Sequence, residues 1–191
     1  MSIVSIAMNT YREAIRDKIL YLLIVFGCLS IMASKILGFV SIGDVNKIIM
    51  DISMASISLF GALIAIFVGT NLLYKEMDKR TIYTIVSRPI ARYEFVLGKY
   101  LGLASLIAVT TILMASFSAL YIVMMGGTVD VMFVESVFLI YIKLLLITAF
   151  SVLLSSLASP ILGAIIVISA YVFGHATGIL IDVPPQLEDT A

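Results

Sequence analysis

The chain has 191 residues, of which 62% are hydrophobic and 13% are charged, and its formal net charge is zero. Soluble domains are roughly 45–50% apolar and about 25% charged, so this composition excludes an ordinary soluble domain and indicates that lipid surrounds most of the chain. A single cysteine, Cys28, excludes an intramolecular disulfide and a cysteine-based metal cluster, and a single histidine, His175, leaves little material for a catalytic centre.

The first 18 residues predict a short amphipathic helix. Apolar residues recur at helical spacing, at Ile3, Val4, Ala7, Met8, Tyr11 and Ile15, and polar residues fill the opposite side. We expect this helix to lie in the plane of the membrane interface, with Arg12 and Arg16 facing lipid headgroups or a protein. The alternative is a simple helical extension of the first span.

Five apolar stretches are long enough to cross a bilayer, which takes about 20 residues. They are residues 19–40, 53–74, 101–125, 136–158 and 161–181. Backbone groups in lipid must bond within their own segment, so the expected fold class is an all-α integral membrane protein, a polytopic helical bundle. The last two spans form a tight hairpin, in which Ser159 caps a helix that begins at Pro160. Residues 182–191 are expected to form an external polar tail.

The distribution of positive charge predicts the orientation of the chain. If the N-terminus is cytoplasmic, nine of the twelve lysines and arginines lie inside, namely Arg12, Arg16, Lys18, Lys75, Lys79, Arg80, Arg88, Arg92 and Lys99. Positive residues are enriched in cytoplasmic loops. The sequence therefore predicts a multi-pass protein of the cell (plasma or inner) membrane with its N-terminus in the cytoplasm.

Residues 75–100 form a polar, basic stretch between the second and third spans, and Pro89 divides it. Asp78 is a fair N-cap for a short helix that runs to about Arg88, with Ile82, Ile85 and Val86 on one face. Proline ends this helix, and a second helix begins near Ala91 and continues into the third span. The alternative is an ordinary positive loop without a partner.

Small residues recur in the second span. Gly61, Ala65 and Gly69 fall on one helical face at four-residue intervals, which permits close helix approach. This face is either the contact between two copies of the chain or a contact within one copy, and the sequence does not decide between them.

Lys143 is the charge that lies deepest in a span, about 12 Å from Glu135 along a helix. A lysine at mid-membrane costs about 2.5–3.5 kcal/mol on insertion scales. Lys143 either extends toward the outer headgroups or lines a polar path or a contact with another subunit. His175 is expected to be a packing residue rather than a metal ligand.

The sequence contains no phosphate-binding Gly-x-x-x-x-Gly-Lys-Ser/Thr, no Gly-x-Ser-x-Gly and no His-Glu-x-x-His. We therefore predict no catalytic, cofactor-binding or metal-binding residues. Any coupled ATP hydrolysis takes place on another chain.

The basic stretch carries a pattern of motifs. It reads Glu76, Arg80-Thr81-Ile82, Ile85-Val86-Ser87-Arg88-Pro89-Ile90, Arg92, Glu94 and Val96-Leu97-Gly98-Lys99. This pattern resembles the permease subunits of ABC-2 type transporters, most of all the branch associated with nitrous oxide reductase maturation. In that family an acidic residue precedes Thr-Ile, Leu-Ser-x-Pro-Ile-Ser-Arg and a Leu-Gly-Lys that enters a span. Residues 11–18 also resemble the family's N-terminal interfacial helix.

The resemblance implies that residues 78–88 form a coupling helix that docks on an ABC ATP-binding subunit. The implied coupling residues are Glu76, Arg80, Ile82, Ile85, Val86, Arg88 and Pro89. Arg92, Glu94, Gly98 and Lys99 would form the loop-to-span motif. The further expected partners are a second permease copy or a related permease and the lipid bilayer, with ATP and Mg on the ATP-binding subunit; nucleic acid is not expected.

The sequence departs from the family pattern in two places. Ala91 stands where the family has serine, which weakens a helix cap by about 1 kcal/mol. The family has six spans and five are predicted here, so we expect that the chain is truncated before a sixth span.

The expected function is the permease subunit of an ATP-driven exporter that couples ATP hydrolysis on a separate subunit to translocation. One alternative is a membrane scaffold or assembly factor that recruits a cytoplasmic partner. Another is an ATP-independent secondary transporter, a class that usually carries ionisable groups in several spans.

Overall fold

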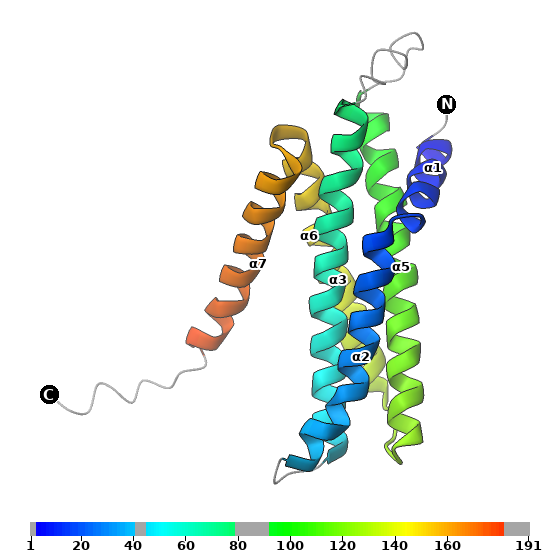
Figure 1. Ribbon diagram of the computed structural model, residues 1–191, viewed down its shortest axis with the longest axis vertical. Helices are drawn as coiled ribbons and strands as arrows, with labels where there is room; N and C mark the ends of the chain where they lie inside the picture. Colours follow the sequence, from blue (N-terminus) through cyan, green and yellow to red (C-terminus); the bar gives the residue numbers. More distant parts are fainter. Residues whose placement is uncertain (1–2, 41–44, 79–91, 182–191) are drawn as a thin grey trace, which may run out of the picture.

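The computed structural model describes residues 3–40, 45–78 and 92–181, and every element in these ranges is a helix. The helices are α1 (Ile3–Ile15), α2 (Lys18–Val40), α3 (Val45–Asp78), α5 (Arg92–Met124), α6 (Val131–Leu157) and α7 (Pro160–Ile181) (Figure 1). The all-α expectation is confirmed.

Most of these helices are apolar around their whole circumference, as expected for helices that contact lipid on one side and protein on the other. In the described part of the chain, four stretches are long and apolar enough to cross a membrane: Lys18–Ile36, Asn46–Asn71, Tyr93–Met124 and Val131–Leu157. A shorter apolar stretch covers Pro160–His175. These helices confirm a polytopic membrane bundle, whereas a full fifth span in α7 stays a prediction.

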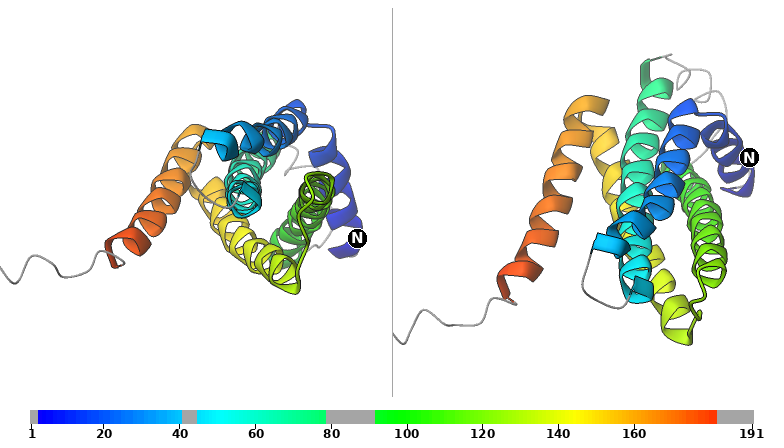
Figure 2. Two further views of the ribbon diagram at one scale, coloured as in Figure 1. Left: turned by 90° about the horizontal axis from the view of Figure 1, so that it is seen from below. Right: turned by 60° about the horizontal axis from the view of Figure 1, so that its bottom comes forward.

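Helix α3 is the centre of the bundle. It packs against α2, α5, α6 and α7, and the view from below in Figure 2 shows it between α2, α5 and α6. Helix α7 packs on α6 and α3 but leans away from the other helices (Figure 1). We call the end where α3 finishes and α5 begins the loop end, and the end where α2 leads into α3 the opposite end.

The small-residue face of α3 packs against α6 of the same chain. A Cβ atom on Gly61 would lie 2.6 Å from Leu144 Cδ1, and one on Gly69 would lie 3.0 Å from Ser151 Cβ. Ala65, between the two glycines, is buried. This face is therefore a contact within one copy of the chain, since α6 of the same chain covers it. Glycine permits the contact because it lacks the side chain that would keep the two helices apart.

Helices α6 and α7 form the predicted hairpin. Only Ala158 and Ser159 separate them, and Pro160 is the first residue of α7. The backbone N–H of Gly163 donates to the carbonyl of Ser159 over 2.8 Å, which begins the helical pattern. Proline suits the first helical position because its missing N–H would find no partner within the helix there.

Candidate coupling surface and intramembrane cluster

Helix α3 extends farther than α6 and α7 at the loop end. Ser155 of α6 donates its hydroxyl to the carbonyl of Thr70 over 3.0 Å, and Gly163 of α7 faces the same threonine, so these three residues lie at one level. Helix α6 ends two residues after Ser155. Helix α3 continues from Thr70 to Asp78, eight further residues that span about 12 Å. The chain therefore leaves the bundle on a projecting helix.

Of the predicted coupling residues, Glu76 lies on this projection. Glu76 belongs to the last turn of α3, whereas Arg80, Ile82, Ile85, Val86, Arg88 and Pro89 lie outside the described residues. Asp78, which we expected to cap a new helix, is itself the last residue of α3. That expectation was wrong because the helix of the second span continues four residues beyond its predicted end at residue 74.

Helix α1 is held against the first part of α5 by two glycines. A Cβ on Gly98 would lie 2.8 Å from Ile6 Cβ, and a Cβ on Gly102 would lie 2.6 Å from the Ala7 carbonyl oxygen and 2.7 Å from Thr10 Cβ. The two glycines stand four residues apart, so they share one face of α5 and let the backbones approach. We had assigned Gly98 to a motif; the spacing of Gly98 and Gly102 was the overlooked signal of helix packing.

The amphipathic pattern of α1 is only partly used in this contact. Thr10 and Ala14 are buried against the bundle, whereas the apolar side chains of Val4 and Met8 are exposed. A break at Arg16 and Asp17 separates α1 from α2, and the carboxylate of Asp17 accepts the N–H of Ile19 over 3.0 Å. Helix α1 is therefore not a simple extension of the first span. The side chains of Arg12 and Arg16 are exposed.

The loop-to-span residues begin α5. Arg92 is its first residue, and Glu94 lies in its first turn, where the helix dipole favours a negative charge. Lys99, which we had counted among the charges of the cytoplasmic loop, is only 1% exposed. Its ammonium nitrogen lies 5.2 Å from the centre of the Phe95 ring, one turn earlier, in a cation–π arrangement. Lys99 is therefore a packed residue at the loop end.

Lys143 joins three helices inside the bundle. Its ammonium group donates to the hydroxyl of Ser58 on α3 over 3.0 Å and lies 4.9 Å from the centre of the Tyr171 ring on α7. The ring of Tyr171 stacks on His175, with centroids 6.0 Å apart and planes 7° apart. We call these four residues the Lys143 cluster. Of the two alternatives given for Lys143, extension toward the outer headgroups disagrees with this geometry, because its amine turns toward α3 and α7.

Ser58 and Tyr171 had not been connected with Lys143 from the sequence. Ser58 is 13 residues from the start of α3 and Lys143 is 12 residues from the start of α6, so both lie about 18–20 Å from the opposite end. The number of residues between each of them and the start of its helix was a signal of this common depth. The sequence contained no signal that α3, α6 and α7 are neighbours.

Comparison with known families matches residues 4–181 to the ABC-2 family transporter proteins. No curated protein matches the chain. Within the described residues, no group of three or more histidines, cysteines, aspartates or glutamates is placed to hold a metal ion. The matched range covers all six described helices apart from the first residue of α1. The chain is thus a multi-pass membrane component of a transporter, and it belongs to the ABC-2 family of transporter proteins.

Proposed function

We propose that this chain is the permease subunit of an ATP-driven exporter whose ATP hydrolysis takes place on a separate subunit. The observation that supports the proposal is the projection of α3 beyond α6 and α7 as far as Asp78, the residue that precedes segment 79–91. The basic, motif-bearing segment is thus joined directly to the central helix. Within the family, the motifs favour the branch associated with nitrous oxide reductase maturation.

The packing of α3 suggests how motion would pass from a docked ATPase into the membrane. Helix α3 contacts α2, α5, α6 and α7. A displacement of α3 at Asp78 would therefore also displace these helices. Helix α5, which begins at Arg92, packs closely against α1 at Gly98 and Gly102. A movement of residues 79–91 would therefore shift the two longest helices and α1 together, which changes access to a path between permease subunits.

The remaining partners follow from the same proposal. A pair of ATP-binding subunits would supply ATP and Mg, and a second copy or a related permease would complete the path. The loop end, with Arg12, Arg16 and Lys18, would face the cytoplasm, since positive residues are retained on that side. Lys143 would provide a polar lining of this path or a contact with another subunit.

The test is to replace residues 79–88 by a glycine–serine segment of equal length. The tagged chain is purified from its native membranes, and chains with the phosphate-binding Gly-x-x-x-x-Gly-Lys-Ser/Thr motif are identified by mass spectrometry. We expect the ATP-binding subunit to be lost, because its docking segment is gone, while insertion into the membrane is unchanged.

The control replaces Gly126–Asp130, the connection between α5 and α6 at the opposite end, by the same kind of segment. This variant should retain the ATP-binding subunit. Retention by the 79–88 variant would refute the docking role, and retention of a cytoplasmic partner without an ATP-binding motif would favour the scaffold alternative.

A further inference from the structure

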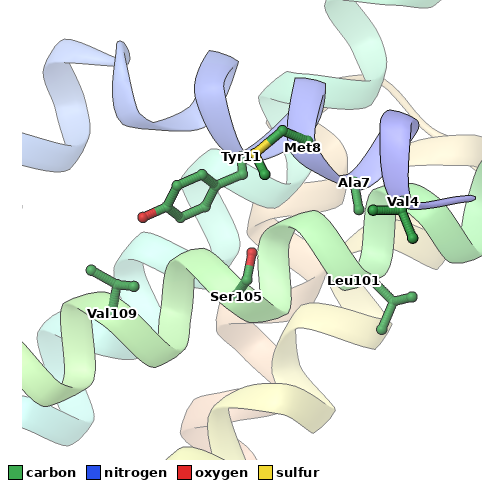
Figure 3. Close-up of a pocket in the computed structure, with 7 residues that line it drawn as sticks. All are labelled: Val4, Ala7, Met8, Tyr11, Leu101, Ser105 and Val109. Carbon is green, nitrogen blue, oxygen red and sulfur yellow. The ribbon is translucent and has the colours of Figure 1, made fainter.

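A groove lies between α1 and the first half of α5. It has a volume of about 300 Å³ and is lined by Val4, Ala7, Met8, Tyr11, Leu101, Ser105 and Val109. Figure 3 shows α1 close to α5 at Val4 and Ala7 and separated from it toward Tyr11 and Val109. Gly98 and Gly102 hold the two backbones together on one flank, and the groove opens on the other. We call it the α1–α5 groove.

The walls of the groove are apolar and exposed. Val4 is 71% exposed, Met8 and Leu101 are each 50% exposed, and Val109 is 47% exposed. These residues lie on the outside of the bundle, since α1 is a peripheral helix that packs chiefly on α5 (Figure 2). Exposed apolar side chains next to one another mark a surface that another apolar group covers.

The level of the groove within the membrane follows from the packing of α2 on α5. Gly27 of α2 faces Met114 of α5. Lys18, the first residue of α2, is nine residues before Gly27, and Ser105 is nine residues before Met114. Because the apolar run of α2 begins directly after Lys18, Ser105 lies near the boundary between hydrocarbon and headgroups. The groove therefore extends across this boundary.

The polar groups at the groove match a phospholipid. Tyr11 and Ser105 carry hydroxyl groups at the groove (Figure 3), and that of Ser105 donates to the Gly102 carbonyl over 2.7 Å. Tyrosine is favoured where one end of a side chain is apolar and the other is wet. Val4, Met8 and Arg12 follow one another at four-residue intervals, so the exposed Arg12 continues the row of α1 residues that lines the groove, and the exposed Arg16 follows at the break after α1. An apolar slot beside two guanidinium groups complements an acyl chain beneath a phosphate.

We propose that the α1–α5 groove binds one anionic phospholipid of the leaflet at the loop end, with an acyl chain that runs from Ser105 toward Val109 and the headgroup at Arg12. A second protein chain on this surface would have to cover the exposed guanidinium groups as well as the apolar walls, whereas a lipid phosphate pairs with them. The site is independent of the proposed export function.

The test uses the purified chain in nanodiscs of phosphatidylethanolamine with a small fraction of phosphatidylglycerol that carries a photoreactive group on one acyl chain. After irradiation, lipid adducts are mapped by mass spectrometry. We expect adducts concentrated on the peptides that line the groove. Ser105→Phe should abolish them, because the ring fills the groove, and Ser105→Leu provides a smaller variant if the phenylalanine prevents folding.

Ser116→Phe is the matched control. Ser116 is also an exposed serine of α5 whose hydroxyl bonds to the preceding turn, but it does not line the groove. A second comparison is Arg12→Gln, which should weaken labelling by phosphatidylglycerol about fivefold relative to labelled phosphatidylethanolamine. Lys47→Gln, which removes an exposed charge at the opposite end, should leave that preference unchanged.

Two results would overturn the proposal. Adducts spread evenly over lipid-facing residues such as Leu120 and Leu146, and insensitive to Ser105→Phe, would show an ordinary lipid annulus. Cross-links between two copies of the chain at the groove would show a protein occupant. Neither result depends on an ATP-binding subunit, so the outcome is separate from that of the docking experiment.

Discussion

Lys143 is a charged residue in the apolar interior of the bundle, where α3, α6 and α7 meet. Its amine bonds to Ser58 on α3 and faces the ring of Tyr171 on α7. In a medium of low dielectric, such contacts are worth more than in water. The cost of placing a lysine at mid-membrane is thus partly offset by its contacts with α3 and α7, and Lys143 helps to fix α7 on the bundle.

A double-mutant cycle of Lys143→Met and Tyr171→Leu tests this role. Each change removes the cation–π contact, so together they should cost less than the sum of the two, with a coupling of about 0.5–2 kcal/mol. Thermal unfolding of the purified variants in detergent measures it. Tyr171→Phe retains the ring and should have little effect.

The control cycle pairs Lys143→Met with Tyr121→Leu. Tyr121 donates its hydroxyl to the carbonyl of Met32 on α2, away from the Lys143 cluster, so these two changes should add. Equal additivity in both cycles would show that the contact of Lys143 with Tyr171 contributes nothing to stability.

Among the helices, α1 is the one whose position depends on two glycines of its neighbour α5. Its contact with α5 requires that Gly98 and Gly102 have no side chains, because the nearest atoms include the carbonyl oxygens of Ile3 and Ala7. Backbone atoms cannot turn aside as a side chain can. Helix α1 and the groove beside it therefore exist because glycine occupies these two positions.

Gly102→Ala should destabilise the protein by about 1–3 kcal/mol, because the new Cβ would meet the Ala7 carbonyl and force α1 outward. Thermal unfolding in detergent checks this. Gly163→Ala is the control, since its Cβ would find its nearest atom at 3.6 Å, an ordinary contact, and alanine favours the helix. Equal unfolding temperatures for the two variants would contradict the account of the α1–α5 contact.

At the scale of the whole molecule, the described charged residues other than Lys143 lie toward the two ends of the bundle. Arg12, Arg16 and Lys18 lie at the loop end, and Lys47 and Asp130 lie at the opposite end. Positive residues that flank spans remain on the cytoplasmic side. We therefore expect the loop end to face the cytoplasm.

Single-cysteine labelling tests this orientation. In a Cys28→Ser background, which removes the chain's one cysteine, an impermeant maleimide should label Lys47→Cys and Asp130→Cys on intact cells. Arg12→Cys should react only after the cells are permeabilised. All three positions are exposed in the structure. Labelling of Arg12→Cys on intact cells would place the loop end outside and would exclude docking of a cytoplasmic ATPase.

Much of the fold was predictable because each span is a local property of its residues. The stretches 19–40 and 161–181 lie within α2 and α7, and the turn before Pro160 was identified from two residues. The ends of α3 were less predictable: it starts at Val45 and finishes at Asp78, well beyond the apolar run. Polar residues can continue a helix past the bilayer, and hydrophobicity does not detect them.

The candidate site was predictable only in part, because hydrophobicity does not reveal which helices become neighbours. The sequence itself determined that the chain is a set of apolar helices, with positive charge concentrated at one end and a family-specific loop between two spans. Only the tertiary structure decided that Gly61 and Gly69 face α6, that Lys143 turns to Ser58 and Tyr171, and that α1 forms a groove with α5. In lipid, all apolar faces are nearly equivalent, so close packing and a few polar contacts, rather than hydrophobicity, select which helices become neighbours.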